Sequence, residues 1–220
     1  MATILITGAN RGIGLALARA YVARGDDVIA AVRVSSDALD GLGVRVIEGV
    51  EVGDDAAVDR LATALGDTRI DVVINNAAIH SNETLEDLSF DRIRKQFEVN
   101  ALGPLRVTRA VLPNLRDGSK VVIVTSRSGS IGDNGSGRTY GYRMSKAAVN
   151  MAGVNLALDL KPRSIPVLLL HPGMVKTDMG GGQAAVEPQD AAARMMARID
   201  ELDMAGTGKF LHCEGYELPW

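Results

Sequence analysis

The chain has 220 residues, of which 46% are hydrophobic and 23% charged, a balance typical of one globular domain. A formal net charge of -3 gives no basic field that would indicate nucleic-acid binding, and we expect no nucleic-acid partner. Cys213 is the one cysteine and the three histidines are scattered, which excludes an intrachain disulfide and leaves no metal-ligand spacing. With no apolar run of about 20 residues and a first expected strand beginning at residue 3, we expect a cytoplasmic protein without signal peptide or membrane partner.

The chain opens with an apolar run, Ile4 to Ile6, that predicts a buried strand. Glycines at positions 8, 12 and 14 follow, and Leu15 to Tyr21 is typical of a helix. A helix N-terminus exposes free N–H groups and a partial positive charge, and glycine lets a phosphate approach them closely. Strand, glycine-rich turn and helix in this order therefore predict a nucleotide site, and a tight structural turn is the alternative.

Strands and helices then alternate along the chain. We expect strands at 27–32, 44–48, 70–74, 120–125, 166–170 and 209–212. We expect helices at 56–65, 90–99, 103–115, 142–160 and 189–199, and the segment 35–43 is too weakly patterned to assign. This alternation predicts a single α/β domain over residues 1–220, with a parallel sheet and helices on both faces. Ligands of such folds lie at the carboxyl ends of the strands, where the polar and glycine clusters fall.

Tyr142 and Lys146 lie four residues apart in the longest expected helix, and therefore share one face of it. A phenol with a pKa of roughly 10 is a poor proton donor or acceptor near neutrality. A fixed cation lowers that pKa, which would make the tyrosine usable as an acid or base. A contact on the helix surface is the simpler alternative.

Six motifs in order make the chain resemble the short-chain dehydrogenase/reductase family over nearly its full length. They are Thr7-Gly8-Ala9-Asn10-Arg11-Gly12-Ile13-Gly14 (TGxxxGxG), Asn75-Asn76-Ala77-Ala78 (NNAG), Asn100, Thr125-Ser126, Tyr142 with Lys146 (YxxxK) and Pro172-Gly173-Met174-Val175-Lys176-Thr177 (PGxVxT). The stretches 126–134 and 214–220 look most like the C-factor and sniffer-like carbonyl reductase branch. The resemblance implies a Rossmann-type, doubly wound sheet of about seven strands in the order 3-2-1-4-5-6-7.

The resemblance also implies an oxidoreductase that reduces a ketone or aldehyde by hydride transfer. Tyr142 would act as the general acid and Ser126 would orient the carbonyl oxygen. Lys146 would lower the pKa of Tyr142 and bond the nicotinamide ribose, and Asn100 would hold a water linking Lys146 to solvent. Ser128 and Ser130 are rivals for the serine, but Ser126 directly follows the expected strand.

Charge predicts which cofactor the site takes. NAD-preferring relatives carry an acidic residue at the end of the second strand, whereas this chain has Val32 followed by Arg33. A guanidinium binds a 2'-phosphate, and Arg11 offers a second cation, so NADP(H) is expected rather than NAD(H). The expected cofactor-binding residues are Gly8, Asn10, Arg11, Gly12, Ile13, Gly14, Arg33, Glu51, Val52, Asn76, Ala77, Ala78, Tyr142, Lys146, Pro172, Gly173, Val175 and Thr177. Ala78 stands where the family's motif has glycine.

Residues 176–190 are expected to form a short substrate-side flap, because three glycines and small side chains predict mobility. The substrate would be a small apolar or aromatic carbonyl compound, with Met144, Met174 and Met179 near it. The resemblance implies a homodimer or homotetramer through the helices 103–115 and 142–160, unless the glycine-rich insertion before Tyr142 covers them. Two alternatives stay open: an NADP(H)-binding signalling or redox-sensing protein of the C-factor type, and a non-redox enzyme on the same fold.

Overall fold

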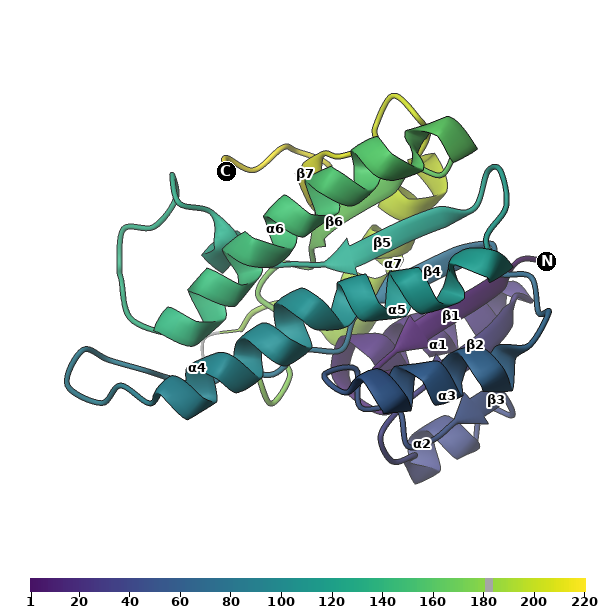
Figure 1. Ribbon diagram of the computed structural model, residues 1–220, viewed down its shortest axis with the longest axis horizontal. Coiled ribbons are helices and arrows are strands. Elements are labelled where there is room, and N and C mark those ends of the chain that lie inside the picture. Colours follow the sequence, from purple (N-terminus) through teal and green to yellow (C-terminus); the bar gives the residue numbers. More distant parts are fainter. Residues whose placement is uncertain (181–183) are drawn as a thin grey trace.

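A seven-stranded parallel sheet forms the centre of the computed structural model, which describes residues 1–180 and 184–220 (Figure 1). The strands are β1 (Thr3–Thr7), β2 (Asp27–Ala31), β3 (Arg45–Ile47), β4 (Val72–Asn75), β5 (Lys120–Val124), β6 (Val167–His171) and β7 (Phe210–His212). Their order is β3-β2-β1-β4-β5-β6-β7, and every neighbouring pair is parallel. The predicted Rossmann-type fold and strand order are therefore confirmed.

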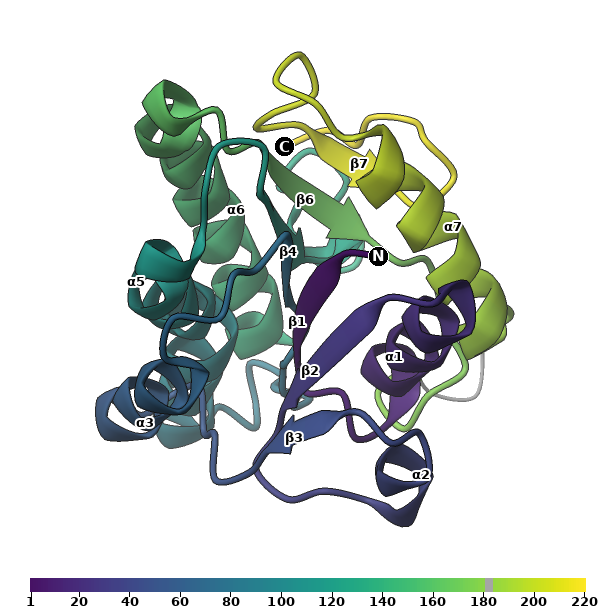
Figure 2. The same ribbon diagram turned by 90° about the vertical axis from the view of Figure 1, so that its right-hand side faces the viewer.

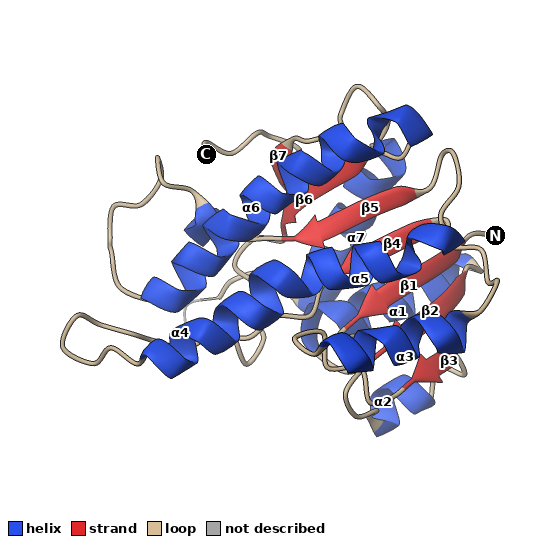
Figure 3. Cartoon of the chain, viewed as in Figure 1, coloured by secondary structure: helices blue, strands red, loops and turns tan. Residues whose placement is uncertain are grey.

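Helices cover both faces of this sheet. They are α1 (Gly12–Arg24), α2 (Asp37–Asp40), α3 (Asp55–Leu65), α4 (Phe90–Gln96), α5 (Gly103–Val111), α6 (Tyr140–Leu160) and α7 (Pro188–Glu201). Figure 2 shows α1 and α7 on one face and α3, α5 and α6 on the other. The secondary-structure colouring of Figure 3 shows the same layers, helix over strand over helix.

The alternation of side chains along β1 shows why a sheet covered on both faces needs an unbroken apolar run. Ile4 and Ile6 belong to one buried cluster, which they share with Leu17 of α1. Leu5, between them in the chain, belongs to a second cluster with Val107 of α5. Successive residues of a strand point to opposite faces, so both faces of β1 are buried and each residue is apolar.

Two segments differ from the prediction. The helices expected at 90–99 and 103–115 form one continuous helical stretch, because a π-helical turn, Phe97–Leu102, joins α4 to α5. The unassigned segment 35–43 contains the short helix α2, and the hydroxyl of Ser36 accepts a hydrogen bond of 3.3 Å from Leu39 N at its start. Among the residues that the structure describes, no helix is both long and apolar enough to cross a membrane.

Candidate active site

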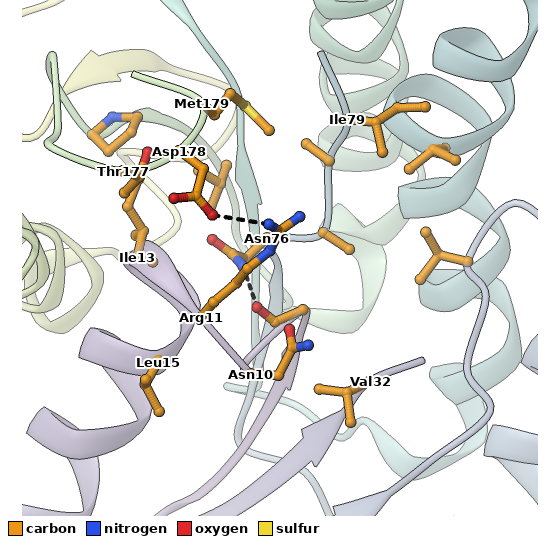
Figure 4. Close-up of a pocket in the computed structure, with 18 of the residues that line it drawn as sticks. Asn10, Arg11, Ile13, Leu15, Val32, Asn76, Ile79, Thr177, Asp178 and Met179 are labelled. Carbon is orange, nitrogen blue, oxygen red and sulfur yellow. Dashed lines mark hydrogen bonds and ion pairs between the residues drawn. The ribbon is translucent and has the colours of Figure 1, made fainter. Parts of the chain in front are cut away.

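A cavity of about 830 Å³ opens at the carboxyl edge of the sheet (Figure 4). It brings together segments far apart in the sequence, from the glycine turn to the loop after β6. Fifteen of the expected cofactor-binding residues line it: Gly8, Asn10, Arg11, Gly12, Ile13, Arg33, Glu51, Val52, Asn76, Ala77, Ala78, Tyr142, Lys146, Pro172 and Thr177. Gly14, Gly173 and Val175 are not among its lining residues.

The glycine turn between β1 and α1 is shaped by close backbone packing. Gly8 and Gly12 have φ angles of 68° and 55°, in the left-handed region that favours glycine. A Cβ atom on Gly14 would overlap the carbonyl oxygen of Gly8 and lie 2.6 Å from Asn76 Nδ2. Asn76 Nδ2 in turn donates to Thr7 O (3.0 Å) and Gly8 O (3.2 Å). Gly14 therefore allows α1 to pack on the turn, and Asn76 supports the turn from behind.

The N-terminus of α1 faces this cavity without a side-chain cap. No side chain at its N-cap position, Arg11, accepts a hydrogen bond from the first turn, and that turn contains no acidic residue. Its free N–H groups and the positive end of the helix dipole favour an anion. A pyrophosphate group therefore fits this end of the cavity.

Charged side chains gather around the end of β2. Arg33 Nη1 lies 3.6 Å from Glu51 Oε2, and Lys95 Nζ from α4 lies 3.8 Å from the same oxygen. Two cations thus face one carboxylate, and the balance favours an additional negative charge. Arg11 is paired differently, because its Nη1 lies 3.0 Å from Asp178 Oδ2 (Figure 4).

The Tyr142 and Lys146 side chains meet at the inner end of the cavity. Lys146 Nζ lies 5.7 Å from the centroid of the Tyr142 ring and donates a hydrogen bond of 2.8 Å to Val124 O. Burial lowers the pKa of Lys146 from its ordinary value of 10.5 to about 8. The ammonium group therefore stays mostly protonated at neutral pH, at a cost in solvation.

The pKa of Tyr142 differs from the expectation. Burial raises it above its ordinary value of 10.0, and the neighbouring Ser126 hydroxyl opposes that shift without reversing it. The lowered pKa that the resemblance implied is therefore not seen in the free protein, where burial dominates, and an effect of Lys146 on Tyr142 stays a prediction. A protonated phenol is the form that can donate a proton.

The loop that follows β5 carries the candidate serine. Ser126 caps a short 3₁₀ helix, Arg127–Gly129, and its hydroxyl accepts a hydrogen bond of 3.1 Å from Ser128 N. A Cβ on Gly129 would lie 2.7 Å from the carbonyl carbon of Lys146, so this glycine lets the loop approach α6. The rival Ser130 donates its hydroxyl to Trp220 O at 3.3 Å, which directs it elsewhere.

Asn100 lies in the π-helical turn and is buried. Its side chain accepts a hydrogen bond from Ile79 N (2.8 Å) and donates to Ile79 O (2.8 Å) and to Ser145 Oγ (3.0 Å). It therefore joins the segment after β4 to α6. Its predicted role in holding a water near Lys146 stays a prediction.

The loop after β6 turns at Gly173, whose φ of 86° requires a left-handed backbone. Val175 is buried and forms a bridge with Val186. Lys176 N also donates to Val186 O at 2.9 Å, so the two ends of the expected flap lie together. Residues 181–183 of that flap lie outside the described residues, and its role stays a prediction.

Fifteen lining residues were not expected in the site, and all but Thr125 and Lys176 lie outside the six motifs and reach the cavity only through folding. They are Leu15, Ala16, Arg19, Ala31, Val32, Val50, Ile79, Lys95, Val99, Val124, Thr125, Lys176, Asp178, Pro188 and Gln189. Of the three methionines expected near the substrate, Met179 lines the cavity. Met144 and Met174 are exposed outside it.

The fold and this cavity define a class of α/β proteins that bind a nicotinamide dinucleotide. The model of the family described as short chain dehydrogenase matches residues 2–187. The chain therefore belongs to the short-chain dehydrogenase/reductase family of oxidoreductases, as the six motifs indicated.

Two relatives share more than 40% sequence identity with this chain. The chain is 43% identical over 226 residues, covering 100% of both sequences, to 1-hydroxy-2-glutathionyl-2-methyl-3-butene dehydrogenase from Rhodococcus sp. (strain AD45). It is 46% identical over 154 residues, covering 69% of this chain and 93% of the other, to a protein named C-signal from Myxococcus xanthus. The expected likeness to C-factor proteins is confirmed.

Two solved structures have the same fold. The NADPH-bound carbonyl reductase from chicken fatty liver superimposes with a TM-score of 0.92 at 28% identity, covering 100% of this chain and 99% of the other. The carbonyl reductase Sniffer of D. melanogaster superimposes with a TM-score of 0.93 at 29% identity, covering 100% of both chains. The expected likeness to sniffer-like carbonyl reductases is confirmed as well.

Proposed function

We propose that this protein reduces a ketone or aldehyde to an alcohol with NADPH as the reductant. The observation that carries the proposal is that Tyr142 and Lys146 line the same cavity as the uncapped N-terminus of α1. The same cavity therefore contains an anion-binding helix N-terminus and a proton-donating side chain. The NADPH-bound carbonyl reductase of the same fold supports this assignment.

The choice of NADPH over NADH follows from charge. A 2'-phosphate near the end of β2 would meet Arg33 and Lys95, which both face the carboxylate of Glu51. When bound, the nicotinamide supplies the hydride that adds to the carbonyl carbon. The chain's own residues must then orient the carbonyl and supply the proton.

Tyr142 gives its hydroxyl proton to the carbonyl oxygen as the carbon–oxygen double bond becomes a single bond, which yields the alcohol. Its raised pKa keeps it protonated until substrate arrives. Ser126 donates a hydrogen bond to the same oxygen, and the Lys146 ammonium stabilises the phenolate that remains. Asn100 fixes α6 against the segment after β4, so these groups keep their geometry.

The substrate is a small carbonyl compound with an apolar part, because Ile79 and Met179 line the cavity together with Tyr142. The Rhodococcus relative is named for a dehydrogenase of a glutathionyl alcohol, so oxidation of such a thioether alcohol is the reverse reaction to test first. The likeness to C-signal favours a second candidate, a signalling protein that binds NADP(H) with little turnover.

The test is NADPH oxidation with a panel of aryl ketones, aldehydes and diketones, followed through the absorbance of the reduced nicotinamide. We expect turnover by the wild-type protein. Replacing Tyr142→Phe should lower kcat by about 100- to 10,000-fold and leave NADPH binding unchanged, because only the proton donor is lost. Full activity of this variant would exclude Tyr142 as the acid. Tight NADPH binding without turnover on any substrate would favour the signalling alternative.

A further inference from the structure

Glu83 is a carboxylate with no exposed surface, in the segment between β4 and α4 and outside the lining of the cavity. It accepts hydrogen bonds from the Ser81 hydroxyl, from Gln96 Nε2 at 3.2 Å and from Gly141 N at 3.2 Å. Arg92 Nε lies 3.7 Å from it. Burial alone would raise the pKa of Glu83, but these hydrogen bonds outweigh burial and hold it below its ordinary value.

The partners of Glu83 come from three elements, which the carboxylate therefore holds together. Gln96 ends α4, and Ser81 lies in the same loop as Glu83. Gly141 belongs to the first turn of α6, whose N–H groups have no partner within the helix. A carboxylate is the acceptor that a helix N-terminus favours. The first turn of α6 is the turn that carries Tyr142.

The backbone just before α6 is strained, and Glu83 contacts it through a second hydrogen bond, which its main chain accepts. Arg138 and Thr139 have φ angles of 60° and 47°, a left-handed conformation that is unfavourable for a β-branched residue such as Thr139. Thr139 N donates to the backbone oxygen of Glu83 at 2.7 Å. A Cβ on Gly141 would overlap Gln96 Nε2 and lie 3.1 Å from Ile93 Cα, so the start of α6 is pressed against α4.

The same loop also meets the aromatic ring of Tyr142. The ring of His80, three residues before Glu83, lies edge-on to the Tyr142 ring, with centroids 4.8 Å apart and an interplanar angle of 71°. The contacts of Glu83 thus fix both the helical turn that carries Tyr142 and the loop that packs against its ring.

We propose that Glu83 is a positioning residue for Tyr142: its buried carboxylate sets where the phenol stands relative to the substrate carbonyl, without touching substrate or cofactor. This inference rests on the proposed function. A displacement of about 1 Å in a reacting group can cost a hundredfold in rate. Loss of the Glu83 contacts therefore lowers turnover and leaves the distant cofactor end of the cavity intact.

The test is Glu83→Gln, which keeps the shape of the side chain but places an NH₂ group next to groups that donate hydrogen bonds to the wild-type carboxylate. We expect kcat to fall about ten- to a hundredfold, with the Kd for NADPH within about twofold of wild type. Glu86→Gln, an exposed carboxylate in the same loop, is the matched control and should keep the wild-type kcat. The double variant Glu83→Gln with Gln96→Glu swaps the two side chains, so that one carboxylate again lies beside one amide. We expect it to recover kcat to within about fivefold of wild type.

A wild-type kcat in Glu83→Gln would overturn the inference, and so would a loss of kcat matched by an equal loss of NADPH binding. If Glu83→Gln does not fold, Ser81→Ala removes one hydrogen bond to the carboxylate. It should lower kcat about threefold or more at unchanged NADPH affinity, and no change would overturn the inference. Absence of turnover in wild type and in Glu86→Gln alike would count against the proposed function itself, which separates the two failures.

Discussion

Burial controls the proton chemistry of the two central side chains, Tyr142 and Lys146. It raises the pKa of the phenol and lowers the pKa of the ammonium to about 8, so each shifts toward its neutral form. An acid that keeps its proton suits carbonyl reduction near neutral pH. The cost is a lysine whose charge is poorly solvated, and that cost is measurable.

We predict that Lys146→Met stabilises the protein and abolishes turnover. The shift from 10.5 to about 8 corresponds to roughly 3 kcal/mol, and loss of the hydrogen bond to Val124 O offsets part of it, so we expect a gain of about 1–3 kcal/mol at pH 7.

The sign of this effect depends on pH. Above pH 8 folded wild type releases the Lys146 proton, whereas the unfolded chain keeps it up to about 10.5, so wild-type stability rises with pH across this window. The advantage of the methionine variant should therefore shrink between pH 8 and pH 10.5. Urea unfolding of both proteins at several pH values measures this difference in stability. A difference that does not change with pH would count against a buried charged lysine.

We predict that Arg33→Ala weakens NADPH binding about ten- to a hundredfold, because a charge-assisted hydrogen bond is worth about 1.5–3 kcal/mol. NADH lacks the 2'-phosphate, so its Kd should change little. Fluorescence titration with both cofactors measures the difference, and the exposed Arg69→Ala is the control. Equal weakening of NADPH and NADH would argue against a phosphate contact.

At the scale of elements, the junctions of helices and strands place the site. Gly14 brings α1 onto the turn after β1, and Gly129 brings the serine loop onto α6. In both places a backbone atom occupies the position that a side chain would need. Short-range packing of this kind places the N-terminus of α1 at the cavity and the Ser126 loop against the helix that carries Tyr142.

We predict that Gly14→Ala lowers the free energy of unfolding by about 1–3 kcal/mol or more, because its Cβ would overlap a backbone carbonyl that cannot rotate away. It should also weaken NADPH binding, because α1 must move. Gly135→Ala is the control, since a Cβ there meets nothing within 4 Å. Urea unfolding measures both variants, and similar stabilities would contradict the packing argument.

At the scale of the whole molecule, α6 presents an apolar stripe to solvent. Met144, Met151 and Leu158 follow one another at intervals of seven residues, and Met151 and Leu158 are 63% and 65% exposed. The glycine-rich insertion before Tyr142 therefore leaves this stripe uncovered. A second copy of the chain would bury it, which keeps the homodimer as our prediction.

We predict that sedimentation analysis finds a dimer and that Met151→Glu gives a folded monomer, whose unfolding midpoint, unlike that of the dimer, does not depend on protein concentration. A charge on this face prevents burial of the stripe but disturbs nothing inside the subunit. Ala64→Glu, an exposed site on α3, should leave the dimer intact. A monomeric wild type would contradict this prediction.

Local patterns in the sequence predicted the alternating strands and helices, the glycine turn and fifteen of the residues that line the cavity, and the family resemblance implied the strand order. They do so because apolar runs, glycines with positive φ and family motifs act within a few residues. The π-helical turn around Asn100 escaped prediction, since the same periodicity fits an ordinary helix. Tertiary structure alone decided that Glu83 is buried against α6, that Asp178 faces Arg11 and that the pKa of Tyr142 rises. Each of these depends on contacts or solvent exclusion by residues distant in the chain, which no local pattern encodes.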